Sequence, residues 1–266
     1  MATVLFMADA IFEDRRLAEI YDPLDPDRSD LDAYAAIVEE FDARSVLDIG
    51  CGTGTFACLI ASRGIEVTGL DPAGASLDVA RAKPGADRVR WVQGEAASLP
   101  PLQVDLVTMT ANVAQVFLTD QEWDSVLRRA YAALRPGGRL VFETRDPARQ
   151  AWLEWNRGSS QARTDIPGMG TVRTWVEVTD IRGELVSFRS VVVFEADGSV
   201  LTSDSTLRFR HRDEIVDSLV SAGFVPEDIR DAPDRPGREL VFVARRPVEH
   251  PPGAGHAATL RLRRSR

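Results

Sequence analysis

The feature that most constrains this chain is a cluster of three glycines, Gly50, Gly52 and Gly54, in the stretch VLDIGCGTG (46–54). An apolar segment precedes the cluster, and TFACLIAS (55–62) follows it with enough apolar residues to pack one side of a helix. This order predicts a strand, a tight turn and a helix. Because three glycines in five positions remove every side chain that would keep a ligand off the backbone, we interpret the turn as a ligand-binding loop.

Composition indicates an ordinary globular protein. The chain has 266 residues, of which 44% are hydrophobic and 27% charged, enough for one large domain or two small ones. It contains no apolar run of 18 residues, and its first residues lack a basic start, so we expect neither a membrane span nor a signal peptide, and a cytoplasmic location. Cys51 and Cys58 are the two cysteines, and we expect both to be small apolar fillers, with no disulfide and no metal site.

Charge is distributed unevenly along the chain. The formal net charge is -9, but residues 245–266 hold six arginines and one acid, which leaves 26 basic and 40 acidic residues elsewhere. A body this acidic repels phosphate backbones, so a nucleic-acid partner is not expected. Residues 247–266 are predicted to be a disordered basic tail, with a basic arm for RNA as the alternative.

Strands and helices alternate after the glycine turn. Predicted strands are 65–71, 89–94, 104–110 and 139–144, and predicted helices are 55–63, 73–82 and 120–134. Pro136 and the Gly137-Gly138 pair form the stop signal between the last of these helices and the fifth strand. Such alternation predicts an α/β fold with a parallel sheet covered by helices on both faces.

The pattern changes after residue 144. Residues 145–170 are predicted to be irregular and are followed by a three-stranded antiparallel meander, a helix that Gly223 caps and a last strand. The meander therefore interrupts the parallel domain. The predicted units are a lid and helix (1–44), a core (45–144), an inserted meander for substrate, lid or dimer contacts (145–210), the rest of the core (211–246) and the basic tail (247–266).

The spacing of the glycines restricts the ligand. A dinucleotide-binding enzyme would show G-x-G-x-x-G, with an acid about 20 residues later. This chain shows G-x-G-x-G, and Asp48 lies inside the preceding strand. A carboxylate in this strand would repel phosphate groups, whereas it would attract a ligand that carries an ammonium group.

VLDIGCGTG resembles the signature of class I S-adenosylmethionine-dependent methyltransferases of the small-molecule type. VTGLDPAGASLDVAR, WVQGEAASLP, VDLVTMTANVAQVF and ALRPGGRLVFET extend the resemblance over residues 31–144 and 211–245. The resemblance implies S-adenosylmethionine as cofactor and a Rossmann-like, seven-stranded, mostly parallel sheet. Its last strand, here 239–245, would run antiparallel to the others.

The resemblance also implies roles for particular residues. Gly50, Gly52 and Gly54 would line the methionine and ribose, and Asp48 would support the ammonium group. Asp71 would accept hydrogen bonds from both ribose hydroxyls, with a helix N-cap as the alternative. Glu95 and Ala96 would meet the adenine, unless Glu95 is an exposed loop acid. Thr110 would lie at the methionine end, and Tyr21 would belong to the lid or be a packed structural tyrosine.

The acceptor site is less well specified. Asn112, Arg145 and Trp152 are the candidate substrate contacts, and His211 and Asp146 are the candidate groups for base or orienting work. Each has a plain alternative: His211 as a cap or surface residue, Arg145 and Asp146 as an ion pair in the loop, and Trp152 with Trp155 as core packing under the meander.

These expectations lead to one main hypothesis. The protein would move a methyl group from S-adenosylmethionine to an oxygen or nitrogen of a small molecule by in-line displacement, as a monomer or homodimer. The alternatives are an RNA or protein methyltransferase that uses the basic tail, and a non-catalytic regulator that binds the cofactor. Neither the acceptor nor the choice between oxygen and nitrogen follows from the sequence.

Overall fold

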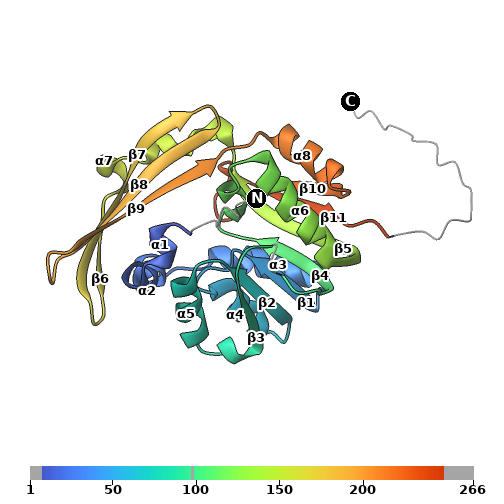
Figure 1. The fold of residues 1–266 in the computed structure, drawn as a ribbon, viewed down its shortest axis with the longest axis horizontal. Coiled ribbons are helices and arrows are strands. Elements are labelled where there is room, and N and C mark those ends of the chain that lie inside the picture. Colours follow the sequence, from blue (N-terminus) through green and yellow to red (C-terminus); the bar gives the residue numbers. More distant parts are fainter. Residues whose placement is uncertain (1–7, 97–98, 249–266) are drawn as a thin grey trace, which may run out of the picture.

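The computed structural model describes residues 8–96 and 99–248 and contains two separate sheets (Figure 1). The larger sheet has the strand order β10-β11-β5-β4-β1-β2-β3. Its strands are β1 (Ser45–Ile49), β2 (Glu66–Asp71), β3 (Val89–Gln93), β4 (Val104–Met109), β5 (Leu134–Arg145), β10 (Val225–Asp231) and β11 (Glu239–Arg245). The strands β1 to β5 pair in parallel, whereas β11 runs antiparallel to both β5 and β10. The predicted seven-stranded sheet with an antiparallel strand at 239–245 is confirmed.

Helices cover both faces of this sheet. They are α3 (Asp30–Glu40), α4 (Thr55–Ser62), α5 (Gly74–Ala82), α6 (Asp120–Ala133) and α8 (Arg212–Ser221). On one face, Tyr34 of α3 and Ile60 of α4 pack with Val46 of β1. On the other, Leu127 of α6 and Leu219 of α8 join a second apolar cluster with the strands. Because helices bury both faces of the sheet, the place that remains for a ligand is the carboxyl edge of the parallel strands.

The smaller sheet has four antiparallel strands in the order β6-β7-β8-β9. They are β6 (Ala162–Ile166), β7 (Gly170–Arg182), β8 (Leu185–Phe194) and β9 (Val200–Arg208). The prediction of three strands after an irregular 145–170 segment was wrong in one respect, because β6 lies within that segment. Its sequence ARTDI lacks apolar alternation, since the strand is mostly exposed. The strand β6 forms because its main chain pairs with that of β7 through hydrogen bonds.

The segment between the sheets contains short helices. Two 3-10 helices, Pro147–Arg149 and Ala151–Glu154, follow β5, and α7 (Arg157–Ser160) precedes β6. The Ser160 hydroxyl accepts a hydrogen bond from the Val176 amide at 2.9 Å, which attaches α7 to β7. The inserted unit is therefore structured from its start.

Two N-terminal helices, α1 (Ala10–Glu13) and α2 (Arg15–Leu24), lie between the smaller sheet and α5 (Figure 1). Leu17 and Ile20 pack against Phe194 and its apolar neighbours in the smaller sheet. On the other side, the Ser76 hydroxyl of α5 donates to the Phe12 carbonyl at 2.9 Å. The N-terminal segment thus joins the inserted sheet to the edge of the core that carries the glycine turn.

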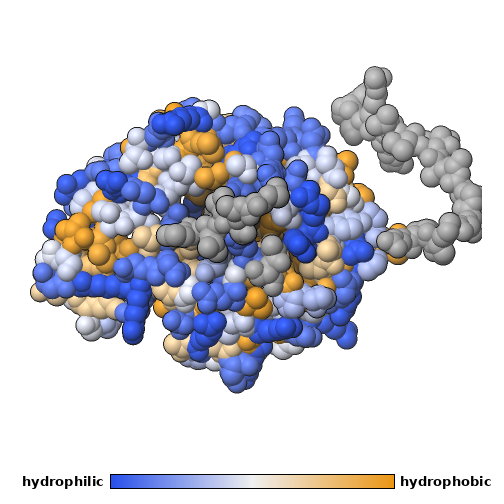
Figure 2. All heavy atoms as spheres, in the orientation of Figure 1, coloured by the Kyte–Doolittle hydropathy of each residue, from blue (hydrophilic) through white to orange (hydrophobic). Residues whose placement is uncertain are grey.

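The surface shown in Figure 2 is largely hydrophilic, with apolar residues in separate small groups. Within the described ranges, 8–96 and 99–248, no helix combines the length and the hydropathy that crossing a membrane requires. The predicted basic tail falls mostly on residues 249–266, which lie outside the described part.

Candidate functional site

The glycine turn connects β1 to α4 with all three glycines at positive φ, +72° at Gly50, +52° at Gly52 and +75° at Gly54. A Cβ at Gly50 would overlap Val113, and one at Gly54 would overlap the Trp91 ring. A Cβ at Gly52 would meet no atom within 4 Å. The role of all three glycines in lining the cofactor stays a prediction. Gly50 and Gly54 make room for side chains of the protein, and Gly52 alone opens toward empty space.

Asp71, the last residue of β2, contacts this turn directly. One carboxylate oxygen, Oδ2, accepts from the Gly52 amide at 2.8 Å, and Oδ1 accepts from the Ala73 amide at 2.8 Å. The second bond serves the start of α5, as the capping alternative expected. Each oxygen keeps a further lone pair, so these bonds leave the carboxylate able to accept from ligand hydroxyls. Burial raises the pKa of Asp71 above its ordinary value.

Asp48 is the most completely buried acid of the turn, with 1% of its surface exposed. Its Oδ1 accepts from the Thr108 hydroxyl at 2.8 Å, whereas Oδ2 is buried without a partner in the described part of the chain. Burial raises the pKa of Asp48 to about 7, and the charge of Asp71 adds to that shift. A buried carboxylate oxygen without a donor is costly, and a ligand ammonium would supply the missing donor and charge.

The α2 helix is attached to the turn through Asp22, a contact that the sequence analysis missed. Its Oδ1 accepts from the hydroxyls of Thr53 at 2.7 Å and Thr55 at 3.2 Å, and its Oδ2 forms an ion pair with Lys83. Lys83 is the one lysine in the chain. Neighbouring residues give no signal for these contacts, which join positions 31 to 61 residues apart.

A second group of buried acids lies at the carboxyl end of β5, and the sequence analysis missed it too. Glu143 and Glu239 are 4% and 3% exposed. Asn112, in the turn after β4, donates its backbone amide to Glu143 at 3.1 Å and its side-chain amide to Glu239 at 3.2 Å. Burial raises the pKa of Glu143 to about 8, with further contributions from Glu239 and Asp234. The available signal was a glutamate inside the apolar strand LVFET.

Comparison with known proteins agrees with this geometry. A family model described as a methyltransferase domain matches residues 46–138. The cypemycin N-terminal methyltransferase of a Streptomyces species is 30% identical over 187 residues, which cover 68% of this chain and 74% of the relative. The chain belongs to the class I S-adenosylmethionine-dependent methyltransferases.

Two further proteins are similar to this methyltransferase over different spans. A ubiquinone biosynthesis O-methyltransferase of Klebsiella pneumoniae is 32% identical over 146 residues, and the match spans 59% of that relative's length. The solved structure of CalS10, an amino pentose methyltransferase from Micromonospora echinaspora with bound S-adenosylmethionine, is 24% identical with a TM-score of 0.67. The alignment covers 92% of this chain and 100% of CalS10, so the inserted sheet and the N-terminal helices belong to a known fold.

The cofactor of this methyltransferase family is S-adenosylmethionine, and the residues at the turn fit it. Asp48 has an unpartnered buried oxygen for an ammonium group, and Asp71 has lone pairs free for hydroxyls. The space above Gly52 allows close approach to the backbone. The structure thus brings together three of the predicted cofactor residues.

The other predicted cofactor residues of the methyltransferase are placed as follows. Thr110 is buried, and its carbonyl accepts from the Val113 amide at 3.3 Å. Glu95 is exposed and Ala96 half-buried. Tyr21 of α2 is half-buried against Phe12, with ring centroids 5.7 Å apart, and burial raises its pKa. Their contacts with the cofactor stay predictions.

Arg145 and Asp146 follow the last buried residues of β5. The Arg145 guanidinium donates to Gln115 at 3.0 Å and lies 3.7 Å from Glu239, so it is an internal partner of the acid cluster. Burial lowers its pKa. The Asp146 carboxylate accepts from the Ala148 amide at 3.0 Å and so stabilises its own turn. Both residues thus make structural contacts, but the ion pair of Arg145 is with Glu239 and not with Asp146 as the plain alternative expected, and a substrate contact stays a prediction.

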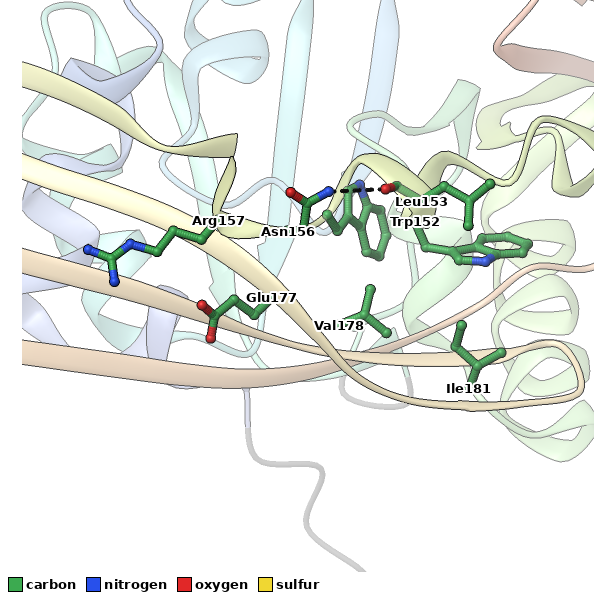
Figure 3. Close-up of a pocket in the computed structure, with 8 residues that line it drawn as sticks. Trp152, Leu153, Asn156, Arg157, Glu177, Val178 and Ile181 are labelled. Atoms are coloured by element: carbon green, nitrogen blue, oxygen red, sulfur yellow. Dashed lines mark hydrogen bonds between the residues drawn. The ribbon is translucent and has the colours of Figure 1, made fainter. Parts of the chain in front are cut away.

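Trp152 and Trp155 pack against the inserted sheet, as their structural alternative predicted. The ring centroids of Trp152 and Phe209 lie 4.6 Å apart, and those of Trp155 and Phe188 lie 4.8 Å apart. They also line a hollow of about 370 Å³ beside β7, whose rim includes the exposed side chains of Leu153 and Ile181 (Figure 3). Neither the buried glutamates nor the glycine turn lines this hollow.

His211 is the N-cap residue of α8, is exposed and makes no side-chain capping bond. This is the position that the surface alternative expected. No contact in the described part of the chain joins His211 to the buried acids, and its role as a base stays a prediction.

Proposed function

We propose that this protein is a cytoplasmic enzyme that transfers a methyl group from S-adenosylmethionine to an oxygen or nitrogen of a small molecule. The observation that carries the proposal is the buried, unpartnered Oδ2 of Asp48, because it fits the ammonium of that cofactor. The opening above Gly52 and the lone pairs of Asp71 support the same placement.

The cofactor, when bound, supplies a methyl group that its sulfonium makes electrophilic. The protein then has to align the acceptor and exclude water. Asp48, Gly52 and Asp71 would hold the cofactor, and α2 would cover it because Asp22 attaches that helix to Thr53 and Thr55.

Relatives leave the acceptor atom open. The names of the two curated relatives state methylation at an N-terminus and at an oxygen, respectively. The first of these favours one second candidate, the α-amine of a peptide as acceptor. Methylation of RNA through the basic tail and a purely regulatory role remain the other hypotheses.

Calorimetric titration with S-adenosylmethionine, S-adenosylhomocysteine and NAD tests the cofactor site. We expect saturable binding of the first two and none of NAD. Asp71→Ala and Gly52→Val should each weaken binding at least tenfold. Gly183→Val is the matched control, because Gly183 also has a positive φ (+60°) and open space but lies in the β7–β8 turn.

The result that would overturn the proposal is unchanged cofactor affinity in both Asp71→Ala and Gly52→Val. If binding behaves as expected, release of S-adenosylhomocysteine in the presence of candidate acceptors measures turnover. A wild-type enzyme that binds the cofactor but never turns over would favour the regulatory hypothesis.

A further inference from the structure

The turn after β4 has a backbone that glycine would ordinarily supply. Ala111 and Asn112 have φ of +55° and +62°. Two successive non-glycine residues in this region are strained, and such strain is concentrated at functional sites. The bend directs the Asn112 backbone amide at Glu143, with a distance of 3.1 Å to Oε1. The strain therefore holds a buried acid in a defined position at the carboxyl edge of the sheet.

The two buried glutamates beside this turn differ in how their charges are balanced. Glu239 is 3.0 Å from the Arg235 guanidinium and 3.7 Å from that of Arg145. Glu143 has no ion-pair partner among residues 8–96 and 99–248, and its one hydrogen bond comes from the Asn112 amide. With Asp234 also nearby, three carboxylates share two guanidinium groups. When all three acids are ionised, the cluster lacks one positive charge.

Hydrogen-bond donors are missing at the same place. Oε2 of Glu143 accepts no hydrogen bond from the described residues, and Oδ1 of Asn112 is buried without a partner. The Asn112 side-chain nitrogen is directed at Glu239, which leaves its oxygen as an acceptor. The site thus offers two acceptor atoms, and a ligand that completes it must bring several donors and a positive charge.

We propose that Glu143 and Asn112 bind the acceptor nitrogen of a primary amine that enters as its ammonium ion. This inference rests on the proposed function and names its substrate class. A primary ammonium carries three N–H donors and one positive charge, whereas a hydroxyl carries one donor and no charge. An alcohol brings no charge that would favour the ionised form of Glu143, whereas an ammonium ion does, so the site selects nitrogen over oxygen.

Glu143 also removes the proton that blocks the nitrogen. The ammonium N–H gives its proton to Oε2 of Glu143, and the electron pair of that bond stays on nitrogen as the lone pair that accepts the methyl group. Glu143 becomes a neutral carboxylic acid, which its buried surroundings favour. The proton then passes to water, so one proton is released in each turnover and the methylated product leaves as an ammonium ion.

Paired acceptors test the selectivity. Glucosamine and glucose, phenethylamine and phenethyl alcohol, and glycinamide and glycolamide differ only in an amine or a hydroxyl. With S-adenosylmethionine, we expect S-adenosylhomocysteine release with amine members and none with their partners. Glu143→Gln should lower kcat/KM for the amine at least 100-fold, remove the acidic limb of its pH profile, and leave the calorimetric affinity for S-adenosylmethionine within twofold.

Controls separate this role from a structural one. Glu66→Gln is the matched control, because Glu66 is an exposed strand residue in β2. Glu143→Asp should recover part of the amine activity if a carboxylate at this position is what matters. Methylation of the alcohols by wild type, with Glu143→Gln unimpaired, would overturn the inference. A wild-type protein that does not bind S-adenosylmethionine would instead overturn the proposed function.

A second measurement decides the matter if no member of the panel is methylated. In protein labelled with ¹³C at the glutamate carboxyls, Glu143 is assigned by the signal that Glu143→Gln lacks. Saturating methylammonium chloride should lower the pKa of Glu143 by at least one unit, while methanol and sodium chloride leave it unchanged. An unchanged titration in methylammonium would refute the amine site.

Discussion

At the residue scale, this methyltransferase places acids where folding alone would not put them. Asp48 and Glu143 are buried without an ion-pair partner among the described residues, and burial raises the pKa of both, to about 7 and about 8. An acid whose folded-state pKa is raised binds its proton more tightly in the folded protein. Folding stability is therefore highest at low pH and declines as pH rises from the unfolded-state pKa to the folded one. We interpret this loss of folding stability as the cost of placing buried acids where a ligand can bind them.

Asp48→Asn should restore the lost folding stability and, at the same time, weaken cofactor binding. Without ligand, we expect the variant to melt roughly 5 °C above wild type at pH 8, with the difference shrinking as pH falls from 7 toward 4. Its affinity for S-adenosylmethionine should fall at least tenfold, because the amide carries no charge for the ammonium. Differential scanning fluorimetry from pH 4 to 9 and calorimetry measure the two effects. An equal melting-temperature difference at pH 4 and pH 8 would contradict the linkage.

The glycines of the turn should respond differently to alanine. Gly54→Ala forces a Cβ into the Trp91 ring at φ +75°, and we expect a loss of roughly 2–4 kcal/mol in the free energy of unfolding. Gly52→Ala has open space and should lose only about 1 kcal/mol, from its φ of +52°. Urea denaturation compares the two variants. Similar losses in both would show that the space around the turn had been misassigned.

At the element scale, we expect α2 to control access to the predicted cofactor site. Asp22 is the one residue of this helix that contacts Thr53, Thr55 and Lys83 together, and the partners are partly buried, with 20% of the Lys83 side chain exposed. An ion pair in this setting is screened less than a surface pair. The same helix packs Leu17 and Ile20 on the inserted sheet, so we expect any movement of α2 to involve that sheet as well.

Asp22→Asn should therefore loosen the cover over the site. Without the ion pair to Lys83, we expect S-adenosylhomocysteine to dissociate about tenfold faster and proteases to cleave the N-terminal helices sooner. Asp25→Asn is the matched control, because Asp25 is exposed at the end of the same helix. Stopped-flow displacement and timed trypsin digestion measure the changes. Equal dissociation rates in the two variants would count against a cover held by Asp22.

At the scale of the whole molecule, the inserted sheet and the core act as one unit. Arg208 at the end of β9 pairs with Glu184 in the turn between β7 and β8 at 3.0 Å, with Asp120 of α6 at 2.6 Å and with Glu214 of α8 at 2.7 Å. A three-way ion-pair network restrains geometry better than an isolated surface pair. The inserted sheet is thereby tied to the core at one end and to α1 and α2 at the other.

Removal of residues 249–266 distinguishes the acceptor hypotheses at this scale. If the acceptor is a small molecule, the truncated protein should keep its kcat/KM within twofold, because the truncation removes neither the buried acids nor the glycine turn. If RNA is the acceptor, the truncation should abolish activity on RNA and flatten its salt dependence. Release of S-adenosylhomocysteine by the full-length and truncated chains measures the difference.

Much of the predicted cofactor site could be derived from the sequence, because the residues that form it lie close together in the chain. The glycine turn, Asp48 and Asp71 lie within about one βαβ unit, where periodicity and spacing specify backbone direction. Strand β6 was missed because its residues carry no apolar alternation and depend on pairing with β7. Glu143 was missed because a lone glutamate in an apolar strand says nothing of its neighbours across the sheet.

The sequence by itself determined the α/β alternation, the strand–turn–helix at the glycines and the family signature, because each depends on residues close together in the chain. Only the tertiary structure decided which glycine faces open space, which acids are buried without an ion-pair partner, and which helix lies against the turn. Asn112 meets Glu143 across 31 residues and Glu239 across 127. Burial and charge balance are properties of such distant encounters, and they decide where the chemistry can take place.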